Sequence, residues 1–375
     1  MGIYEKLGVR RVINAYGNLT LLGGSIISRE VLRAMDEANE CYVDMQELHV
    51  RAGKVVAEIC GAEAAYVTSG AAAALILGTA ACMVGNDSAK MRQLPDTTGM
   101  KSEVIIQKNQ RYSYDRCVEI PGAKFVEVGG ASKTNPEDIE KAITSKTAAI
   151  HYGVSAGRRE GVVPLEKVIR IAKRHGVPVI VDAAAEVYPV ENFKKFVAMG
   201  ADLVAFGGKY WGSPQATGIL IGRKDLIESA AAQGYIGFEY FQNRGLGRGM
   251  KVDRQSVIGL LVALQRWMKM DHDRLLRTWN KKVNYLVKEL NTLRGASAEP
   301  VVWRNGKAYQ ARVKFDEKTL KMTLADVVES LKDGKPSVRV RVEDGGAAIL
   351  VNTRTLLEGE ERIIVRRLRE VVKKA

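Results

Sequence analysis

Between about residues 61 and 222, short apolar segments alternate with segments in which apolar residues recur every three or four positions. The short segments predict strands, and several are apolar at nearly every position, which is typical of strands covered on both faces. The alternation therefore predicts an α/β fold with a mostly parallel sheet and helices on both of its faces. The predicted strands are "AAYVTSG", "SEVIIQ", "AKFVEVG", "TAAIHYG", "VPVIVDAAAEV", "ADLVAFGG" and "TGILIG".

The rest of the chain has helical and mixed patterns. Between residue 30 and Cys60 apolar residues keep a helical spacing, and Gly61 is a typical end for such a helix. After about Gly259 a long helical pattern is followed by short strands and helices, which predicts a smaller α+β domain. We therefore expect an N-terminal arm over residues 1–30, a large domain over residues 31–265 and a small C-terminal domain over residues 266–375.

The composition is that of an ordinary globular protein and argues against several classes. Hydrophobic residues make up 46% of the chain and charged residues 27%, and no apolar run of about 18 residues predicts a membrane span. The first residues lack the apolar core of a secretory signal, so we expect a cytoplasmic protein without a membrane partner. The four cysteines contain no Cys-x-x-Cys pair, which argues against a zinc site and a disulfide scaffold, and we expect no metal.

The net charge of +14 is compatible with an anionic partner, including nucleic acid. The basic residues do not form one block, however, and they recur along amphipathic helical patterns such as "EKVIRIAKRHG". A solvated basic surface explains this pattern, and small anionic substrates would also suit it.

The residues that follow the predicted strands are the candidates for chemistry. A parallel sheet with right-handed crossovers brings the carboxyl ends of its strands to one edge, where ligands bind. These residues are Ser69 and Gly70, residues 107–115, Ser155, Asp182 and Lys209.

The segment Ser69-Gly70-Ala71 joins a predicted strand to a helix of small residues. Backbone N–H groups at a helix N-terminus attract phosphate, and small side chains let the phosphate approach. The segment lacks the Gly-Lys-Ser/Thr ending of a nucleotide-binding P-loop. By itself, the pattern also fits a plain capped helix packed on the sheet.

Lys209 follows one predicted strand, and Asp182 ends the strand before it. Taken singly, Lys209 fits a solvated loop lysine and Asp182 fits a helix cap. A lysine in a buried, electropositive pocket instead has a lowered pKa and becomes a nucleophilic amine. Pyridoxal phosphate requires a lysine for its aldehyde, an acid for its ring nitrogen and an anion site for its phosphate. Lys209, Asp182 and the segment Ser69-Gly70-Ala71 together supply all three, which predicts a site for this cofactor.

A family resemblance spreads over nearly the whole chain, in "RRVINAYGNLTLLGG", "GAEAAYVTSGAAAALIL", "VPVIVDAAAEV", "ADLVAFGGKYWGSPQATGILIG", "GRGMKVDRQSVIGLLVAL" and "VNTRTLLEGEE". These segments resemble the fold-type-I pyridoxal-phosphate enzymes of the aspartate aminotransferase superfamily. More closely, they resemble the bacterial selenocysteine synthases (L-seryl-tRNA selenium transferases) and the D-glucosaminate-6-phosphate ammonia-lyases. The resemblance implies a fold-type-I transferase fold, Lys209 as the Schiff-base lysine, Asp182 as the partner of the ring nitrogen, and Ser69, Gly70 and Ala71 as the phosphate cradle. Ser155 is a further candidate for a contact with the cofactor.

Two positions depart from the family pattern. Relatives often carry a serine two residues before the lysine, where this chain has Gly207, so one hydroxyl contact is missing. Ammonia-lyase-like relatives tend to carry a histidine that covers the cofactor ring, and the corresponding position here is Gln110, next to Arg111. Because an amide or a guanidinium can lie flat on a ring, we expect Gln110 or Arg111 there, with Tyr112 and Tyr114 as the aromatic alternatives.

The resemblance implies a pyridoxal-phosphate-dependent lyase that acts on a small amino acid or amino-sugar acid, such as one like D-glucosaminate 6-phosphate. In such a lyase Lys209 takes the Cα proton, a β-substituent leaves and ammonia is released. The selenium transferases carry an extra region for tRNA ahead of "VINA", a motif that starts here at Val12, so we expect no tRNA partner. The alternatives are a selenocysteine-synthase-like transferase and a cofactor-binding protein with lost or different activity.

An anionic substrate requires cationic side chains, and arginine binds carboxylate and phosphate through two hydrogen bonds. The candidates are Arg354 in "VNTRTLLEG", and Arg248 and Lys251 in "GRGMKV", each of which is also explained as a surface charge. His151 and His49 are weaker candidates, because a lone histidine is more often structural. Sites of this fold type are usually built between subunits, so the resemblance implies a homo-oligomer with shared active sites.

Overall fold

The computed structural model describes residues 2–240, 243–302 and 306–373. The chain forms two compact units: Ile27–Met268, and Met1–Ile26 together with Lys269–Ala375. The segment expected to be an N-terminal arm thus supplies residues to the same unit as the C-terminal third of the chain. The reason is a strand pairing that joins the two ends of the sequence and is described below.

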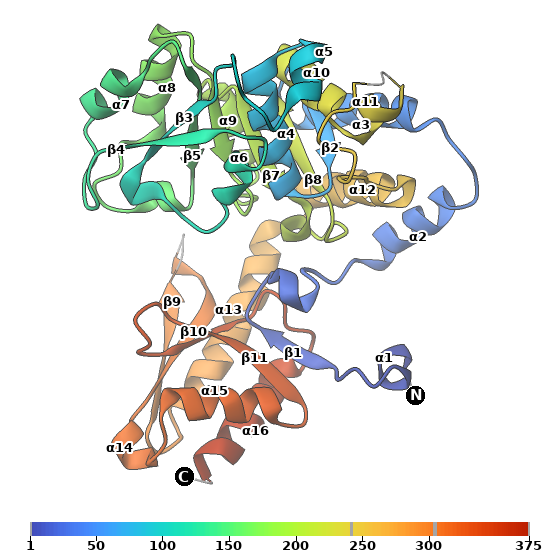
Figure 1. Cartoon of the computed structure of the whole chain (residues 1–375). Helices are drawn as coiled ribbons and strands as arrows, with labels where there is room; N and C mark the ends of the chain where they lie inside the picture. The colour runs from blue at the N-terminus through green and yellow to red at the C-terminus, as the bar shows by residue number, and fades with distance from the viewer. Residues whose placement is uncertain (1, 241–242, 303–305, 374–375) are drawn as a thin grey trace. The chain divides into compact units, whose positions relative to one another are not determined.

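The unit Ile27–Met268 contains a seven-stranded sheet within the described residues (Figure 1). All neighbouring strands run parallel except β8, which is antiparallel to both of its neighbours. The predicted α/β fold with a mostly parallel sheet is therefore confirmed. In spatial order the strands are β2 (Ala64–Thr68), β8 (Gly218–Gly222), β7 (Leu203–Gly207), β6 (Val179–Asp182), β5 (Thr147–Gly153), β3 (Glu103–Gln107) and β4 (Lys124–Val128).

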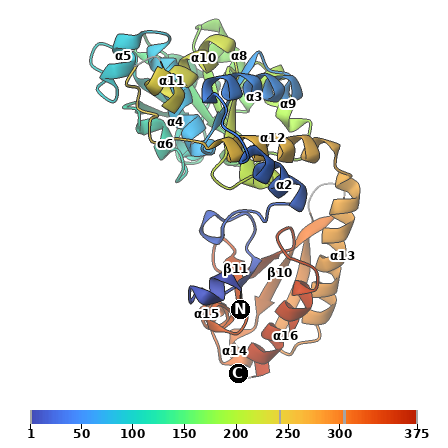
Figure 2. The same cartoon turned by 90° about the vertical axis from the view of Figure 1, so that its right-hand side faces the viewer.

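Helices cover both faces of this sheet, as Figures 1 and 2 show. One layer contains α4 (Ala71–Val84), α6 (Arg116–Glu119) and α10 (Lys224–Gln233), and the other contains α3 (Met45–Cys60), α7 (Pro136–Ala142), α8 (Leu165–Arg174) and α9 (Asn192–Ala198). The remaining helical segments of this unit are α2 (Arg29–Ala38), α5 (Ser88–Gln93), η2 (Lys108–Gln110), η3 (Ala156–Arg158), η4 (Gly208–Trp211), α11 (Tyr235–Tyr240) and α12 (Arg254–Lys269).

The helix α4 is buried almost all round, because it contacts the sheet on one side and α6 and α10 on the other. Its small residues allow this close packing: a Cβ at Gly78 would come within 3.2 Å of the Leu203 side chain of β7. By contrast, α8 buries only the stripe that includes Val168 and Ala172 and keeps a polar outer face. The difference explains why α4 reads as continuously apolar and α8 as amphipathic.

The other unit contains a five-stranded sheet in the described part of the chain. Its strand order is β1 (Val12–Ala15), β11 (Ser337–Val342), β12 (Ile349–Asn352), β10 (Ala308–Phe315) and β9 (Ala296–Val302). The strand β1 pairs in parallel with β11, from Val12 opposite Ser337 to Ala15 opposite Val340. The helical segments of this unit are α1 (Ile3–Lys6), η1 (Thr20–Leu22), α13 (His272–Leu290), α14 (Glu317–Leu320), α15 (Leu324–Asp333) and α16 (Glu360–Lys373).

Three elements differ from their predicted form. The helical pattern between residue 30 and Cys60 is two helices, because Asp44 caps α3 by accepting a hydrogen bond from the Glu47 N–H at 2.8 Å. The strands β1 and β9 were not predicted, and β9 contains Pro300, which is tolerated because β9 lies at the edge of its sheet. Among the described helices none has the length and apolar content needed to cross a bilayer.

Candidate active site

The carboxyl ends of the parallel strands meet at one edge of the seven-stranded sheet. In register across the sheet, Asp182 of β6 lies between Gly153 of β5 and Ala205 of β7. On the far side of β7, the first residue of β8, Gly218, lies between Gly207 and Thr68. The residues that follow these positions include most of the predicted site residues, and they are therefore delivered to the same edge.

The helix α4 begins at this edge, directly after β2. Gly70 is its N-cap with φ at +120°, a conformation that favours glycine, and no side chain caps the helix. The Thr68 hydroxyl donates to the Gly70 carbonyl at 3.0 Å, which fixes the turn. A Cβ at Gly70 would meet no heavy atom within 4 Å. The first turn of α4 therefore offers backbone N–H groups beside open space, as an anion site requires.

Asp182 is the last residue of β6 and is half-buried. Its Oδ1 accepts a hydrogen bond from the Ala184 N–H at 3.0 Å, and its Oδ2 accepts one from the Tyr112 hydroxyl at 2.5 Å. A carboxylate has about four acceptor positions on its two oxygens, so Asp182 can accept a further donor. The geometry suits a protonated ring nitrogen as that donor.

Lys209 lies in η4, immediately after β7. Partial burial lowers the pKa of its amine, and its Nζ lies 5.1 Å from the centroid of the Tyr210 ring. A lowered pKa increases the fraction of neutral, nucleophilic amine at neutral pH. The position and the lowered pKa of Lys209 therefore fit the predicted role of an amine that reacts with an aldehyde.

The glycine that replaces the expected serine, Gly207, is tightly packed. A Cβ here would come within 3.3 Å of two carbons of the Tyr210 ring and 3.4 Å of the Ala184 carbonyl oxygen. The Tyr210 ring therefore packs against the position where relatives often carry a serine hydroxyl. The next residue, Gly208, is more restricted still, since a Cβ would lie 2.3 Å from Thr217 Oγ1.

Gln110 and Arg111, expected to contact the ring of a cofactor, already have other partners. Gln110 is fully buried, and its Nε2 donates to the Gly153 carbonyl at 3.2 Å. Arg111 forms ion pairs with Asp115 and Glu127 and lies over the Phe125 ring, with 4.6 Å from its Cζ to the centroid. Because the amide and the guanidinium already bind these groups, the contacts do not favour the ring-covering role, which stays a prediction.

Tyr112, the aromatic alternative, contacts two residues at the sheet edge. Its hydroxyl lies 2.5 Å from Asp182 Oδ2 and 3.0 Å from His151 Nε2. His151 is therefore part of the site region, although it lies buried in β5. Ser155 follows β5 at the start of η3, with an exposed side chain.

The three predicted anion-binding cations have different surroundings. The Arg248 guanidinium lies 2.7 Å from Glu239 Oε1, and Lys251 is exposed. Arg354 lies in the other compact unit, where its guanidinium carbon is 4.6 Å from the Tyr309 ring centroid. Their role toward a substrate stays a prediction.

The residues at this edge fit pyridoxal phosphate. The uncapped start of α4 with open space at Gly70 suits the phosphate, Asp182 has acceptor positions left for the ring nitrogen, and Lys209 supplies an amine of lowered pKa. These observations are independent of one another, and each meets one requirement of the cofactor. Within the described residues no group of three or more His, Cys, Asp or Glu side chains is arranged to hold a metal ion.

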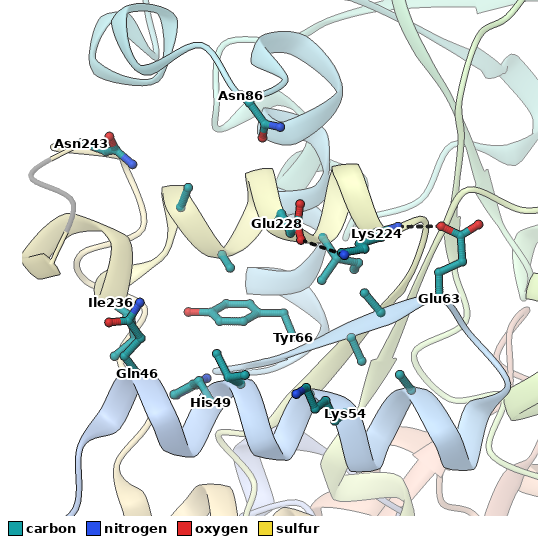
Figure 3. Close-up of a pocket in the computed structure, with 18 of the residues that line it drawn as sticks. Gln46, His49, Lys54, Glu63, Tyr66, Asn86, Lys224, Glu228, Ile236 and Asn243 are labelled. Atoms are coloured by element: carbon teal, nitrogen blue, oxygen red, sulfur yellow. Dashed lines mark hydrogen bonds and ion pairs between the residues drawn. The ribbon is translucent and has the colours of Figure 1, made fainter.

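A separate pocket of about 840 Å³ opens beside the edge strand β2. Figure 3 shows α3 and α10 on its two sides, with Tyr66 and His49 pointing into it. The His49 Nε2 lies 2.8 Å from the Tyr235 hydroxyl, and burial lowers the pKa of His49 to about 4. Lys224 and Glu228 form an ion pair at its rim. Of the predicted site residues only His49, a weaker candidate, lines this pocket, so the structure places it away from Lys209 and Asp182.

Comparison with known proteins places the chain among a set of related sequences. The family model described as "SelA: L-seryl-tRNA selenium transferase" matches residues 12–294. The chain is 33% identical to the 5'-C-glycyluridine monooxygenase-decarboxylase of a Streptomyces species, over 98% of this chain and 92% of the relative. It is 30% identical to the D-glucosaminate-6-phosphate ammonia lyase of Salmonella typhimurium, over 100% of this chain and 98% of the relative. An L-seryl-tRNA(Sec) selenium transferase of Aquifex aeolicus is 26% identical over 77% of this chain and 66% of the relative.

Solved structures similar to this chain include one enzyme of the same kind as these relatives. The structure of a D-glucosaminate-6-phosphate ammonia-lyase superposes with a TM-score of 0.87 at 29% sequence identity, covering 100% of this chain and 99% of the other. A NifS-like protein gives a TM-score of 0.62 at 16% identity, over 97% of this chain and 100% of the other. A serine palmitoyltransferase from Sphingomonas wittichii gives 0.60 at 13% identity, over 97% and 88%. The last two likenesses show the fold alone, which is the expected fold type I.

Proposed function

The chain belongs to the family of the L-seryl-tRNA selenium transferases, and on that basis we propose that it is a pyridoxal-phosphate-dependent lyase. Its substrate is a small amino acid or amino-sugar acid of the D-glucosaminate 6-phosphate type, from which it releases ammonia. The observation that carries this proposal is the likeness to a D-glucosaminate-6-phosphate ammonia-lyase over the full length of both chains, at a TM-score of 0.87.

Three groups at the sheet edge would hold the cofactor. The N–H groups at the start of α4, at Gly70 and Ala71 beside Ser69, would bind the phosphate, Asp182 would accept a hydrogen bond from the ring nitrogen, and Lys209 Nζ would hold the aldehyde. Pyridoxal phosphate, when bound, supplies an electron sink for negative charge on the carbon next to the substrate amino group.

Lys209 is the base of the reaction. Once its Nζ is free, the amine takes the proton from the carbon that carries the substrate amino group, and the substituent on the next carbon leaves. Burial favours the neutral form of the amine, which is the form that can accept this proton. The short helix η4 holds the base beside the end of β7, and Gly208 lets this turn pack closely on Thr217, whose Oγ1 a Cβ at Gly208 would approach to 2.3 Å.

Two other reactions are compatible with the family. The name of the Streptomyces relative describes an oxygenase and decarboxylase, and its identity to this chain is 33%, so oxygen-dependent decarboxylation of an amino acid group is the second candidate. Transfer to seryl-tRNA is less well supported, because the selenium transferase of Aquifex aeolicus is 26% identical over 66% of its length.

A homo-oligomer with shared active sites is part of the proposal. Apolar side chains are exposed before and within α3, including Tyr42 at 94% and Val50 at 52% exposure. Val50 also lines the pocket beside β2. A second copy that covers these groups would remove them from water. Sedimentation equilibrium of wild type and of Val50→Arg tests the point, since only an oligomer built through this surface dissociates in the variant.

The reaction is tested by supplying the cofactor-loaded protein with D-glucosaminate 6-phosphate, D-glucosaminate, small amino acids and a glycyl nucleoside. Ammonia, keto acid, carbon dioxide and oxygen consumption are measured in parallel, with Lys209→Ala as the inactive control. Ammonia and keto acid without oxygen consumption support the lyase. Oxygen consumption with carbon dioxide release would replace it with the oxygenase. No product from any of these amines contradicts both.

A further inference from the structure

Tyr112 connects two polar residues on neighbouring strands of the seven-stranded sheet. Its hydroxyl lies 2.5 Å from Asp182 Oδ2 of β6 and 3.0 Å from His151 Nε2 of β5. An ionised carboxylate can only accept hydrogen bonds, so the single phenolic proton is donated to Asp182. The Tyr112 oxygen then accepts, and His151 must donate through an Nε2–H. The three side chains form one directed chain of hydrogen bonds from His151 through Tyr112 to Asp182.

The protonation states of His151 and Tyr112 are consistent with donation from His151 through Tyr112 to Asp182. Burial lowers the pKa of His151, against the opposing influence of Asp182 and Asp115, so its ring stays neutral and carries one N–H. Burial and the charge of Asp182 raise the pKa of Tyr112, so the phenol keeps its proton. The other ionisable groups that face this pair are Arg111, Asp115 and Cys117. Hydrogen bonds that point the same way strengthen one another in a medium of low dielectric constant.

The Tyr112 ring is held from several sides. Its backbone N–H donates to Asp115 Oδ2 at 3.1 Å, and the same carboxylate holds Arg111. The ring stacks on His151 with 5.9 Å between centroids and 14° between planes. It also lies against Gly153, where a Cβ would come within 3.1 Å of Tyr112 Cε1. Because Tyr112 is held in this way, its hydroxyl can fix the orientation of the Asp182 carboxylate.

The position of Tyr112 in the fold gives this contact a function. The chain passes from β3 outward to β4 and then back through β5 and β6, so β3 and β5 flank the point where strand order reverses. Ligands of open α/β sheets bind at such a point, beyond the carboxyl ends of the strands. Tyr112 follows β3 and reaches Asp182 across β5, while both oxygens of Asp182 still have acceptor positions.

We propose that Tyr112, itself held by His151, is a positioning residue that orients the Asp182 carboxylate toward the ring nitrogen of the cofactor. The inference rests on the proposed function, because it assigns Asp182 to pyridoxal phosphate. With one Asp182 oxygen tied to Tyr112 and the other to the Ala184 N–H, the plane of the carboxylate is fixed before the cofactor arrives. The cofactor then meets a preorganised acceptor, which improves its affinity.

A double-mutant cycle on cofactor affinity tests this role. The dissociation constant of pyridoxal phosphate is measured by titrating the cofactor-free enzyme and following the visible absorbance of the bound form. We expect Tyr112→Phe to weaken binding on the order of tenfold in the wild-type background. In the Asp182→Ala background the same substitution should change binding less than about twofold, because the group through which Tyr112 acts is gone. Tyr240→Phe, which removes another hydrogen bond from a phenol to a carboxylate, that of Asp44, is the matched control and should leave the affinity unchanged.

His151 supplies a second, independent test. In His151→Gln the Nε2 of the amide can still donate to Tyr112, whereas His151→Met fills a similar volume without a donor. Recovery of wild-type affinity in the glutamine variant, with a loss like that of Tyr112→Phe in the methionine variant, supports the chain of hydrogen bonds. Circular dichroism of each cofactor-free variant establishes that it folds, and Tyr112→Phe alone decides the matter if a His151 variant does not.

Three outcomes would overturn the inference. Tighter cofactor binding by Tyr112→Phe would mean that the phenol competes with the ring for Asp182. An equal loss in the Asp182→Ala background would mean that Tyr112 acts only on the fold, and no loss in either background would mean that it has no role. A wild-type protein that binds no pyridoxal phosphate would instead overturn the proposed function, and this inference with it.

Discussion

Gly218 of β8 lies directly against Gly70 at the start of α4: a Cβ on Gly218 would come within 2.6 Å of the Gly70 carbonyl carbon. The same Cβ would be 2.8 Å from the Ala71 nitrogen. The antiparallel strand thus brings a residue without a side chain under the turn that precedes the helix. This contact seats the first turn of α4 at the sheet edge, where the proposed phosphate site lies.

Replacing Gly70 by alanine should weaken cofactor binding. The φ of +120° disfavours a side chain, so we expect a loss of about 1–3 kcal/mol in the free energy of unfolding. The methyl group also enters the open space beside the first turn of α4. Gly85→Ala is the matched control, because Gly85 ends the same helix with φ at +55° and equally open surroundings. Both variants should unfold at lower urea concentrations than wild type, and only Gly70→Ala should lose affinity for pyridoxal phosphate. Equal affinities of the two variants would contradict a phosphate site at this turn.

Replacing Lys209 by alanine should abolish the covalently held cofactor. The visible absorbance of the loaded enzyme disappears, and borohydride no longer fixes the cofactor to the protein, because no amine remains at the end of β7. The control is Lys167→Ala, which removes an exposed lysine from α8 in the same unit. Peptide mass spectrometry after borohydride treatment of wild type should find the modified residue within the peptide that contains Lys209. A modified lysine elsewhere would refute the assignment.

The rate of cofactor capture should depend on pH in a way that reflects the Lys209 amine. Burial lowers the pKa of Lys209, and only the neutral amine attacks an aldehyde. The capture rate of the cofactor-free enzyme should therefore rise with pH and reach its plateau below the range of an ordinary lysine, whose pKa is about 10.4. Stopped-flow absorbance across the alkaline range measures this midpoint. A midpoint at the ordinary value would show that the amine is solvated.

Gly207 and Gly208 should respond very differently to serine. At Gly207 the nearest atoms are ring carbons of Tyr210 at 3.3 Å, which can shift by a few tenths of an ångström, so we expect a loss of about 1 kcal/mol or less. At Gly208 a Cβ would lie 2.3 Å from Thr217 Oγ1 and 2.9 Å from the Thr217 carbonyl oxygen, so we expect about 3 kcal/mol. Urea unfolding of the two variants gives both values, and a Gly207→Ser variant as unstable as Gly208→Ser would contradict the packing described above.

His49 should make the protein less stable in mild acid. Its folded pKa is about 4 against about 6.5 in the unfolded chain, so between these values the unfolded state binds more protons. Stability from this residue is therefore complete above about pH 6.5 and falls by up to about 3 kcal/mol as the pH approaches 4. His49→Gln keeps an N–H donor for Tyr235 but does not titrate. The unfolding free energies of wild type and variant are measured at pH 7 and near pH 4.5. As the pH falls, wild type should lose stability relative to the variant. A difference that does not change with pH would contradict the lowered pKa of His49.

Much of the seven-stranded sheet could be predicted because each element carries its own pattern. The strand that ends in Asp182 and the helix α4 are apolar along their whole length, and such patterns depend only on neighbouring residues. The strands β1 and β9 lack this property, since β1 has only four residues and β9 has an irregular pattern that contains Pro300. The break between α2 and α3 was missed because the apolar spacing continues across it, and the cap at Asp44 is visible only as a single residue.

The site was predictable only in part, and for a related reason. Asp182 ends β6, while Lys209 and Gly70 lie just beyond the ends of β7 and β2, so predicting the strands predicts the common edge. The contact between Tyr112 and Asp182 joins residues 70 positions apart, and it depends on how the loop after β3 folds back over β5. The burial of Gln110 against the Gly153 carbonyl has the same origin, which is why its assignment to the cofactor ring could not be judged from the sequence.

The pairing of β1 with β11 has a consequence for synthesis on the ribosome. Val12 to Ala15 emerge well before their partners from Ser337 to Val340, because the whole of residues 27–268 lies between them in the chain. Residues 27–268, which contain the whole seven-stranded sheet, can form their core while the chain is still growing. The strand β1 must therefore wait for its partner β11 until these residues have been synthesised, and during that time it stays open to chaperones and proteases.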